Sequence, residues 1–95
     1  MLNIMVSKSG ALLTSKGFSK SEVLIGSYEE NDIVLLGTDV DSRHARIFEK
    51  SGNVILIDLK SKAGTFVNGN KVTAPLLLTR GDRISIADFV LEITW

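Results

Sequence analysis

Hydrophobic residues recur at every second position in this chain, and that period limits the folds open to it. Leu2, Ile4 and Val6 alternate with Asn3 and Met5. The same alternation returns near the end of the chain, at Ile84 and Ile86 and then at Phe89, Leu91, Ile93 and Trp95. A period of two places one face of a β-strand in a core, whereas a helix needs a period near 3.6. Because no segment combines helix caps with a sustained amphipathic period, we predict an all-β fold.

Turn signals separate the apolar runs at intervals that suit hairpins. They are "KSGN" at 50–53, "NGN" at 68–70 and "RGD" at 80–82, which we interpret as a turn before a strand and not as an adhesion motif. Asn68 and Gly69 form the strongest signal, because a tight primed turn needs positive φ at both central residues. Between these turns lie short strands at 23–25 and 45–50, and "VILIDL" from Val54 suits a central strand. Many short strands of this kind predict a closed barrel or a two-sheet sandwich.

Size and charge narrow the class of protein. Ninety-five residues, of which 44% are hydrophobic, suit one domain spanning 1–95 with a single core. Eleven basic and eleven acidic side chains cancel, so no overall field attracts nucleic acid or anionic lipid. The chain has no cysteine and no apolar run near the ~20 residues of a spanning helix. We therefore expect a cytoplasmic domain without disulfides, nucleic-acid binding or direct membrane insertion.

The residues able to perform chemistry are few. His44 is the one histidine, and without a second histidine or a cysteine it does not predict a metal site. A triad of Ser42, His44 and one of the aspartates 39, 41 and 58 is weak, since residues two apart on an extended chain point the same way without bonding each other. No glycine-rich loop opens a helix, so no nucleotide or other cofactor is expected. These features favour a binding module, not an enzyme.

Four stretches in order, "IGSYEENDIVL", "VDSRHARI", "IDLKSKAGTFVNG" and "LLLTRGDRISIADFVLEI", resemble a forkhead-associated (FHA) domain from residue 23 to the end. The matching scaffold positions are Gly26, Asp32, Ile33, His44, Ser61, Gly64, Thr65, Val67, Asn68, Gly69, Gly81 and Asp82. The resemblance implies an FHA/SMAD-like antiparallel sandwich of about eleven short strands. It also implies recognition of phosphothreonine peptides by loops at one end of the sandwich.

Three positions depart from the family's pattern for holding phosphate. Ser27 stands where the family has arginine, Asp41 where it has serine and Ala63 where it has asparagine. Losing the arginine and one serine bond removes about 4 kcal/mol, or roughly a thousandfold in affinity. Asp41 also repels a phosphothreonine, which carries roughly −1.5 to −2 charges at neutral pH. Further acidic residues lie in the same predicted loops, at Glu29, Glu30 and Asp39.

Other residues are able to compensate or to support the loops. Ser42 offers a hydroxyl, and Arg43 and Lys62 offer cations beside the expected pocket. His44 is expected to brace one loop against another, and Gly64 to supply a backbone geometry that a Cβ forbids. The candidate partner-binding residues are Ser27, Asp41, Ser42, Arg43, Ser61, Lys62, Ala63, Thr65 and Asn68, and the candidate bracing residues are Gly26, His44, Gly64 and Gly69.

Two functional hypotheses follow from these residues. The first is a phosphorylation-independent FHA-type interaction module that helps to assemble a larger complex in signalling or secretion; the alternative is a phosphothreonine-peptide reader with a rearranged pocket. The ending "GDRISIADFVLEI" is similar to that of FHA domains in bacterial secretion-system proteins. The sequence leaves open whether the chain is complete or a module of a longer protein.

Overall fold

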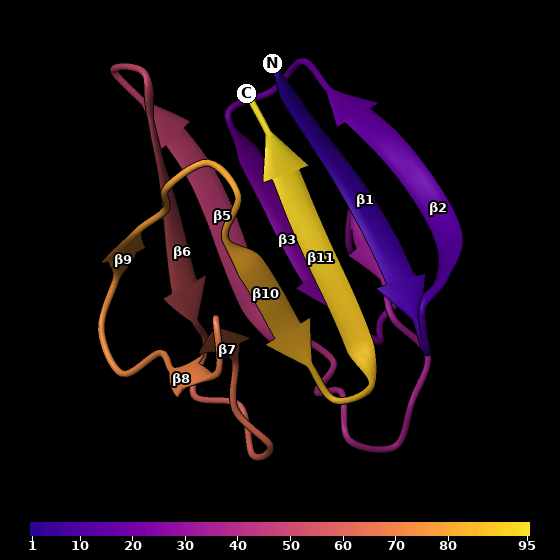
Figure 1. Ribbon diagram of the computed structural model, residues 1–95. Helices are drawn as coiled ribbons and strands as arrows, with labels where there is room; N and C mark the ends of the chain where they lie inside the picture. The colour runs from indigo at the N-terminus through magenta and orange to yellow at the C-terminus, as the bar shows by residue number, and fades with distance from the viewer.

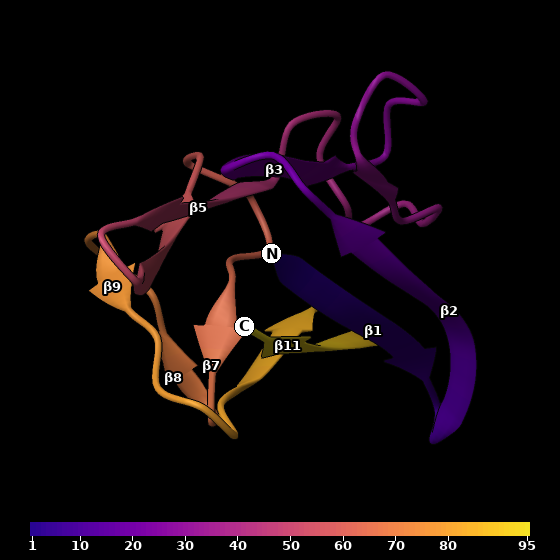
Figure 2. The same cartoon turned by 90° about the horizontal axis from the view of Figure 1, so that it is seen from above.

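Two β-sheets pack face to face in the computed structural model, which describes residues 1–95 (Figures 1 and 2). The strands are β1 (Leu2–Lys8), β2 (Ala11–Phe18), β3 (Glu22–Gly26), β4 (Ile33–Val34), β5 (Ala45–Lys50), β6 (Asn53–Asp58), β7 (Phe66–Val67), β8 (Asn70–Lys71), β9 (Leu76–Leu77), β10 (Arg83–Ile86) and β11 (Phe89–Thr94). One sheet has the order β2-β1-β11-β10-β7-β8 and the other β4-β3-β5-β6-β9. The predicted all-β sandwich of eleven strands is confirmed, and the barrel alternative is excluded because both sheets keep free edges.

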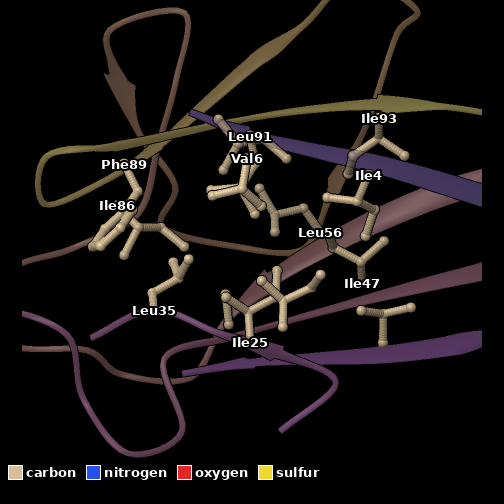
Figure 3. Packing of buried hydrophobic residues seen from close by; sticks show 14 of the residues in the cluster. Ile4, Val6, Ile25, Leu35, Ile47, Leu56, Ile86, Phe89, Leu91 and Ile93 are labelled. Atoms are coloured by element: carbon tan, nitrogen blue, oxygen red, sulfur yellow. The ribbon is translucent and has the colours of Figure 1, made fainter. Parts of the chain in front are cut away.

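Alternating residues of both sheets fill the space between them. Leu2, Ile4 and Val6 of β1 are at most 1% exposed, and their neighbours Asn3 and Met5 face outward. Strand β1 pairs with β11 and thereby joins the two ends of the chain in one sheet. Figure 3 shows the labelled side chains of β1 and β11 facing those of β3, β5 and β6 across the core. The period-two reading of these strands is therefore confirmed.

The predicted turns have the backbone geometry that the sequence indicates. Asn68 and Gly69 take φ values of 51° and 85° between β7 and β8, as a primed turn requires. Ser51 and Gly52 do the same between β5 and β6, with φ values of 54° and 81°. Gly81 has φ 94° in the turn that precedes β10. The hairpins at 51–52 and 68–69 thus fix the register of the strands that they join, whereas the turn at Gly81 connects β9 and β10 in different sheets, so the hairpin expected at "RGD" is not formed.

Two features of the sheets differ from the sequence prediction. Strand β2 has no clear alternation, because it is an edge strand whose residues are mostly exposed, Leu12 to 63% and Leu13 to 55%. The second difference is that β4 pairs with β3 in parallel, so the sandwich is not wholly antiparallel. For two strands to pair in parallel, the chain must run back so that the second strand points in the same direction as the first. The loop after β3 does this within six residues, 27–32.

Three loops lie together at the end of the sandwich opposite the two termini (Figure 1). They follow β3 (residues 27–32), β4 (35–44) and β6 (59–65), and we refer to them as the apical loops. Every partner-binding residue predicted from the sequence lies in these loops except Asn68. No helix of the structure is long and apolar enough to cross a membrane.

Candidate functional site

Close backbone contact joins the first two apical loops. The N–H of Ser27 donates to the carbonyl of Asp41 at 2.9 Å, and that of Tyr28 donates to the carbonyl of Ser42 at 3.4 Å. A Cβ on Gly26 would lie 2.2 Å from the Ser42 carbonyl oxygen, closer than any real contact. Gly26 therefore allows the two loops to approach each other. Ser27 itself is half-buried at this junction.

Asn31 crosslinks the same two loops and was missed in the sequence. Its side chain is 6% exposed, and its amide nitrogen donates to the carbonyls of Tyr28 at 2.9 Å and Ser42 at 2.7 Å. Its amide oxygen accepts from the guanidinium of Arg43 at 3.1 Å. The one available signal was an asparagine in a turn three residues after Tyr28, a spacing that suits a side-chain bond to a loop carbonyl.

His44 ties the loop after β4 to the loop after β6. The ring is fully buried; Nδ1 accepts the N–H of Asp41 at 3.1 Å, and Nε2 lies 2.9 Å from the carbonyl oxygen of Gly64. Because an N–H can only donate, this geometry assigns the proton to Nε2 of a neutral ring. The ring therefore connects backbone groups of two apical loops. Both ring nitrogens are occupied by backbone groups and neither bonds Ser42, so the Ser-His arrangement of a triad is not formed.

Asp58, at the end of β6, organises the third loop. Its carboxylate accepts the hydroxyl of Ser61 at 2.5 Å, the hydroxyl of Thr65 at 2.7 Å and the N–H of Ser61 at 3.2 Å. Partial burial acts to raise the pKa of Asp58, but these hydrogen bonds outweigh it and leave the pKa below its ordinary value. The Ser61 hydroxyl in turn accepts the N–H of Gly64, whose φ is 91°. Asp58 was weighed only as a triad member, although its spacing of three from Ser61 is typical of an Asx turn.

Three predicted partner-binding residues have their polar side-chain groups engaged within the protein, and one is Ser61, whose hydroxyl is bound to Asp58 and Gly64. Thr65 is fully buried with its hydroxyl bound to Asp58, so its assignment to the partner surface is corrected to an internal support. Asn68 lies on the β7–β8 turn, where its amide nitrogen donates to Asp82 at 2.9 Å and its oxygen accepts the N–H of Arg83 at 3.0 Å. Its amide therefore joins two turns of the scaffold.

Asp41 occupies the centre of the site. Its carboxylate accepts the N–H of Lys62 at 3.1 Å and so links the loop after β4 to the loop after β6. The next residue, Ala63, is exposed and brings no polar side-chain group. The Lys62 N–H, which lies where two loops meet, is thus already bound to a carboxylate of the same protein.

Both positively and negatively charged side chains surround Asp41 on the apical loops. Arg43 and Lys62 are exposed, and the Arg43 guanidinium is the one held in place by Asn31. On the loops after β3 and β4, three exposed carboxylates make no ion pair in the structure: Glu29, Glu30 and Asp39. Ser42 and Ser61 are half-buried nearby. The structure therefore brings together acidic and basic groups from three loops, without an arginine after Gly26.

Comparison with known proteins identifies the scaffold. The model of the FHA domain family matches residues 23–87. The transcriptional regulatory protein EmbR of Mycobacterium tuberculosis is 36% identical over 72 residues, which are 74% of this chain and 19% of EmbR. The chain thus spans about a fifth of the length of that relative.

Solved structures agree with this comparison. The M. tuberculosis EmbR structure in complex with a low-affinity phosphopeptide aligns with a TM-score of 0.86 and 25% identity, over 97% of this chain and 24% of that one. The FHA domain of the CT664 protein from Chlamydia trachomatis aligns with a TM-score of 0.88 and 21% identity, over 99% of this chain and 96% of that one. At that identity the second likeness shows the fold alone.

Proposed function

Because the chain belongs to the FHA domain family, we propose that it is an interaction module whose apical loops bind a protein partner without requiring phosphothreonine. The family membership supports protein or peptide binding in general. Binding without phosphothreonine is the more specific part of the proposal, and it depends on the chemistry of the three apical loops.

The bond between Asp41 and Lys62 carries the proposal. An incoming phosphoryl group needs cations and free donors, and here the Lys62 N–H already serves an internal carboxylate. That carboxylate repels a second anion, and Ser27 supplies no charge to offset the repulsion. Removing an arginine and a hydroxyl bond costs about 4 kcal/mol, which corresponds to roughly a thousandfold weaker binding. The site therefore favours a partner that does not present a phosphate.

The alternative is a phosphothreonine reader with a rearranged pocket. Arg43 and Lys62 favour it, because both cations are exposed at the apical end. The likeness to EmbR, which is solved with a low-affinity phosphopeptide, also favours it. Against it, Arg43 is already bound to Asn31, and the acidic residues of the neighbouring loops oppose an anion.

We further propose that the module helps to assemble a larger complex in signalling or secretion. Support comes from the similarity of its ending to FHA domains of secretion-system proteins and from the relation to a regulatory protein. The cytoplasmic location expected from the sequence stays a prediction.

The test is a titration of the ¹⁵N-labelled protein with a degenerate phosphothreonine peptide library and its unphosphorylated twin, followed by NMR. We expect no preference for the phosphorylated library. Phospho-selective binding at micromolar concentration would overturn the proposal and support the alternative.

A double variant, Ser27→Arg with Asp41→Ser, provides the matched control. It restores the family's cation and hydroxyl, so we expect phosphopeptide affinity to rise by a factor on the order of 100 to 1,000. Thermal melting checks that the variant remains folded after losing the bond from Asp41 to Lys62. A folded double variant with no gain would mean that these two side chains do not explain the weak phosphate binding.

A further inference from the structure

The surface hollows of this protein gather along one margin of the sandwich, beside the connection from β8 to β10. Two of them, of about 420 and 530 Å³, share the lining segment 71–75. A third, of about 270 Å³, shares Leu77 and Thr79 with the first. We call these three neighbouring hollows together the β9 groove. It lies where the β8 edge of one sheet meets the β9 edge of the other (Figure 1).

The lining of the β9 groove mixes polar residues with exposed apolar ones, and the strand edge beside it is unpaired. Leu77 is 59% exposed and Leu76 is 36% exposed, while Ala74 and Pro75 are exposed beside them. Strand β9 pairs with β6 on one side only, so its other edge is open. Apolar side chains at an open strand edge suit an extended chain that lays alternate residues into the hollow.

Unused backbone donors line the same groove. The N–H groups of Thr73 and Ala74 make no hydrogen bond within the protein, and the Thr73 hydroxyl makes none either. Their neighbours on both sides are bound: Val72 donates to the carbonyl of Thr65, and Leu78 donates to that of Val54. The segment is thus held at both ends and presents two donors between them, which suits the carbonyl groups of a second chain.

The charge of the groove indicates what kind of chain it fits. Lys60 and Lys71 line the 530 Å³ hollow, and neither forms an ion pair. The carboxylate in that hollow, Asp58, is occupied by the Ser61 and Thr65 hydroxyls. Asp58 keeps its negative charge when hydroxyls bind it, so it offsets one of the two lysines and leaves the hollow with a net charge of +1, which favours an acidic side chain.

We propose that the β9 groove binds an extended peptide segment of a protein partner, with an acidic residue against Lys60 and Lys71 and apolar residues over Pro75, Leu76 and Leu77. Ser61 lines the groove and also belongs to the apical loops, so one partner chain is able to contact both surfaces. The groove does not depend on whether the apical loops require phosphate. The experiment below therefore tests peptide binding by the groove independently of the function proposed above.

The experiment uses three acetylated and amidated peptides. The acidic peptide carries two glutamates followed by alternating leucines; in the basic peptide lysines replace the glutamates, and in the serine peptide serines replace the leucines. The ¹⁵N-labelled protein is titrated with each peptide by NMR. We expect the acidic peptide to shift the amide signals of Thr73, Ala74 and Leu77, and the other two peptides to bind at least about tenfold more weakly.

Charge reversal separates a specific groove from general attraction. We expect Lys60→Glu with Lys71→Glu to weaken the acidic peptide by about tenfold or more and to strengthen the basic peptide. Leu77→Ser should weaken the acidic peptide while leaving the exposed strand folded. Lys16→Glu, on β2 at the opposite margin, is the matched control and should leave all three affinities unchanged (Figure 1).

Three results would overturn the proposal. One is a set of signal shifts confined to the apical loops, and another is equal binding of the acidic and serine peptides. The third is binding to phosphatidylserine vesicles that the lysine variants abolish, with no response to the acidic peptide, because the groove would then serve a membrane surface.

Discussion

Replacing His44 with alanine tests how the apical loops are held together. The ring is fully buried and connects Asp41 to Gly64 through its two nitrogens. In the alanine variant the buried Gly64 carbonyl loses its donor and the Asp41 N–H loses its acceptor, and leaving a buried polar group unpaired costs about 1–3 kcal/mol. The space left by the ring adds to this cost, so we expect a total of about 2–4 kcal/mol.

That loss is large for a domain of this size. Stabilities of about 0.05–0.15 kcal/mol per residue give roughly 5–14 kcal/mol for the whole chain. With about 4–8 °C of Tm per kcal/mol, we expect Tm to fall by roughly 8–32 °C. Urea unfolding measures the free energy of unfolding, and calorimetry measures Tm.

A second variant separates the hydrogen bonds from the space. His44→Phe fills the site but leaves the Gly64 carbonyl without a donor, so it should retain about 1–3 kcal/mol of the loss. Lys50→Ala, on the exposed end of β5, should change stability by less than about 0.5 kcal/mol. A free energy of unfolding for His44→Ala within about 0.5 kcal/mol of the wild type would refute the bracing role. A phenylalanine variant as stable as the wild type would assign the effect to packing alone.

Two further predictions concern the supports of the site. The pKa of Asp58 is lowered in the folded state, so the ionised carboxylate contributes fully to stability above the unfolded pKa of about 3.9, and this contribution disappears as the pH falls through the folded pKa. In urea titrations, the stability advantage of the wild type over Asp58→Asn should therefore shrink from about pH 5 downward. A difference that stays constant to pH 2 would contradict this prediction. Gly26→Ala places a Cβ 2.2 Å from the Ser42 carbonyl oxygen, so we expect the free energy of unfolding to fall by about 2 kcal/mol or more and the amide signals of Ser27 and Tyr28 to shift. A variant with unchanged stability and spectrum would show that the loops adapt to the added atom.

Local chemistry was sufficient to predict the strands that bury one face and the turns that join them. The alternation at Ile84 and Ile86 places both side chains in the core, since a strand has only two faces and one is covered. Asn68 and Gly69 indicate their turn because few residues tolerate positive φ. Such signals act within a few neighbouring residues, and they remain readable without knowledge of the rest of the fold.

The candidate site was predicted only in part, because its bonds join residues far apart in the chain. Asp41 was interpreted as a lost phosphate contact, but the sequence does not show that its carboxylate binds the N–H of Lys62, twenty-one residues away. The contacts of Asn31 with Ser42 and Arg43 were missed for the same reason, whereas Thr65 bonds Asp58 only seven residues away, and its complete burial is decided by how the loop packs.

The edges of the sheets depended on the tertiary structure as well. Strand β2 lacks a buried face, so no period marks it, and the parallel pairing of β3 with β4 arises from the path of a loop. The β9 groove exists only because the edges of two sheets meet beside segment 71–77. The hydrophobic pattern of the sequence shows which residues avoid water. Which groups hydrogen-bond a buried polar atom, and which backbone donors stay free, is decided only when distant segments come into contact.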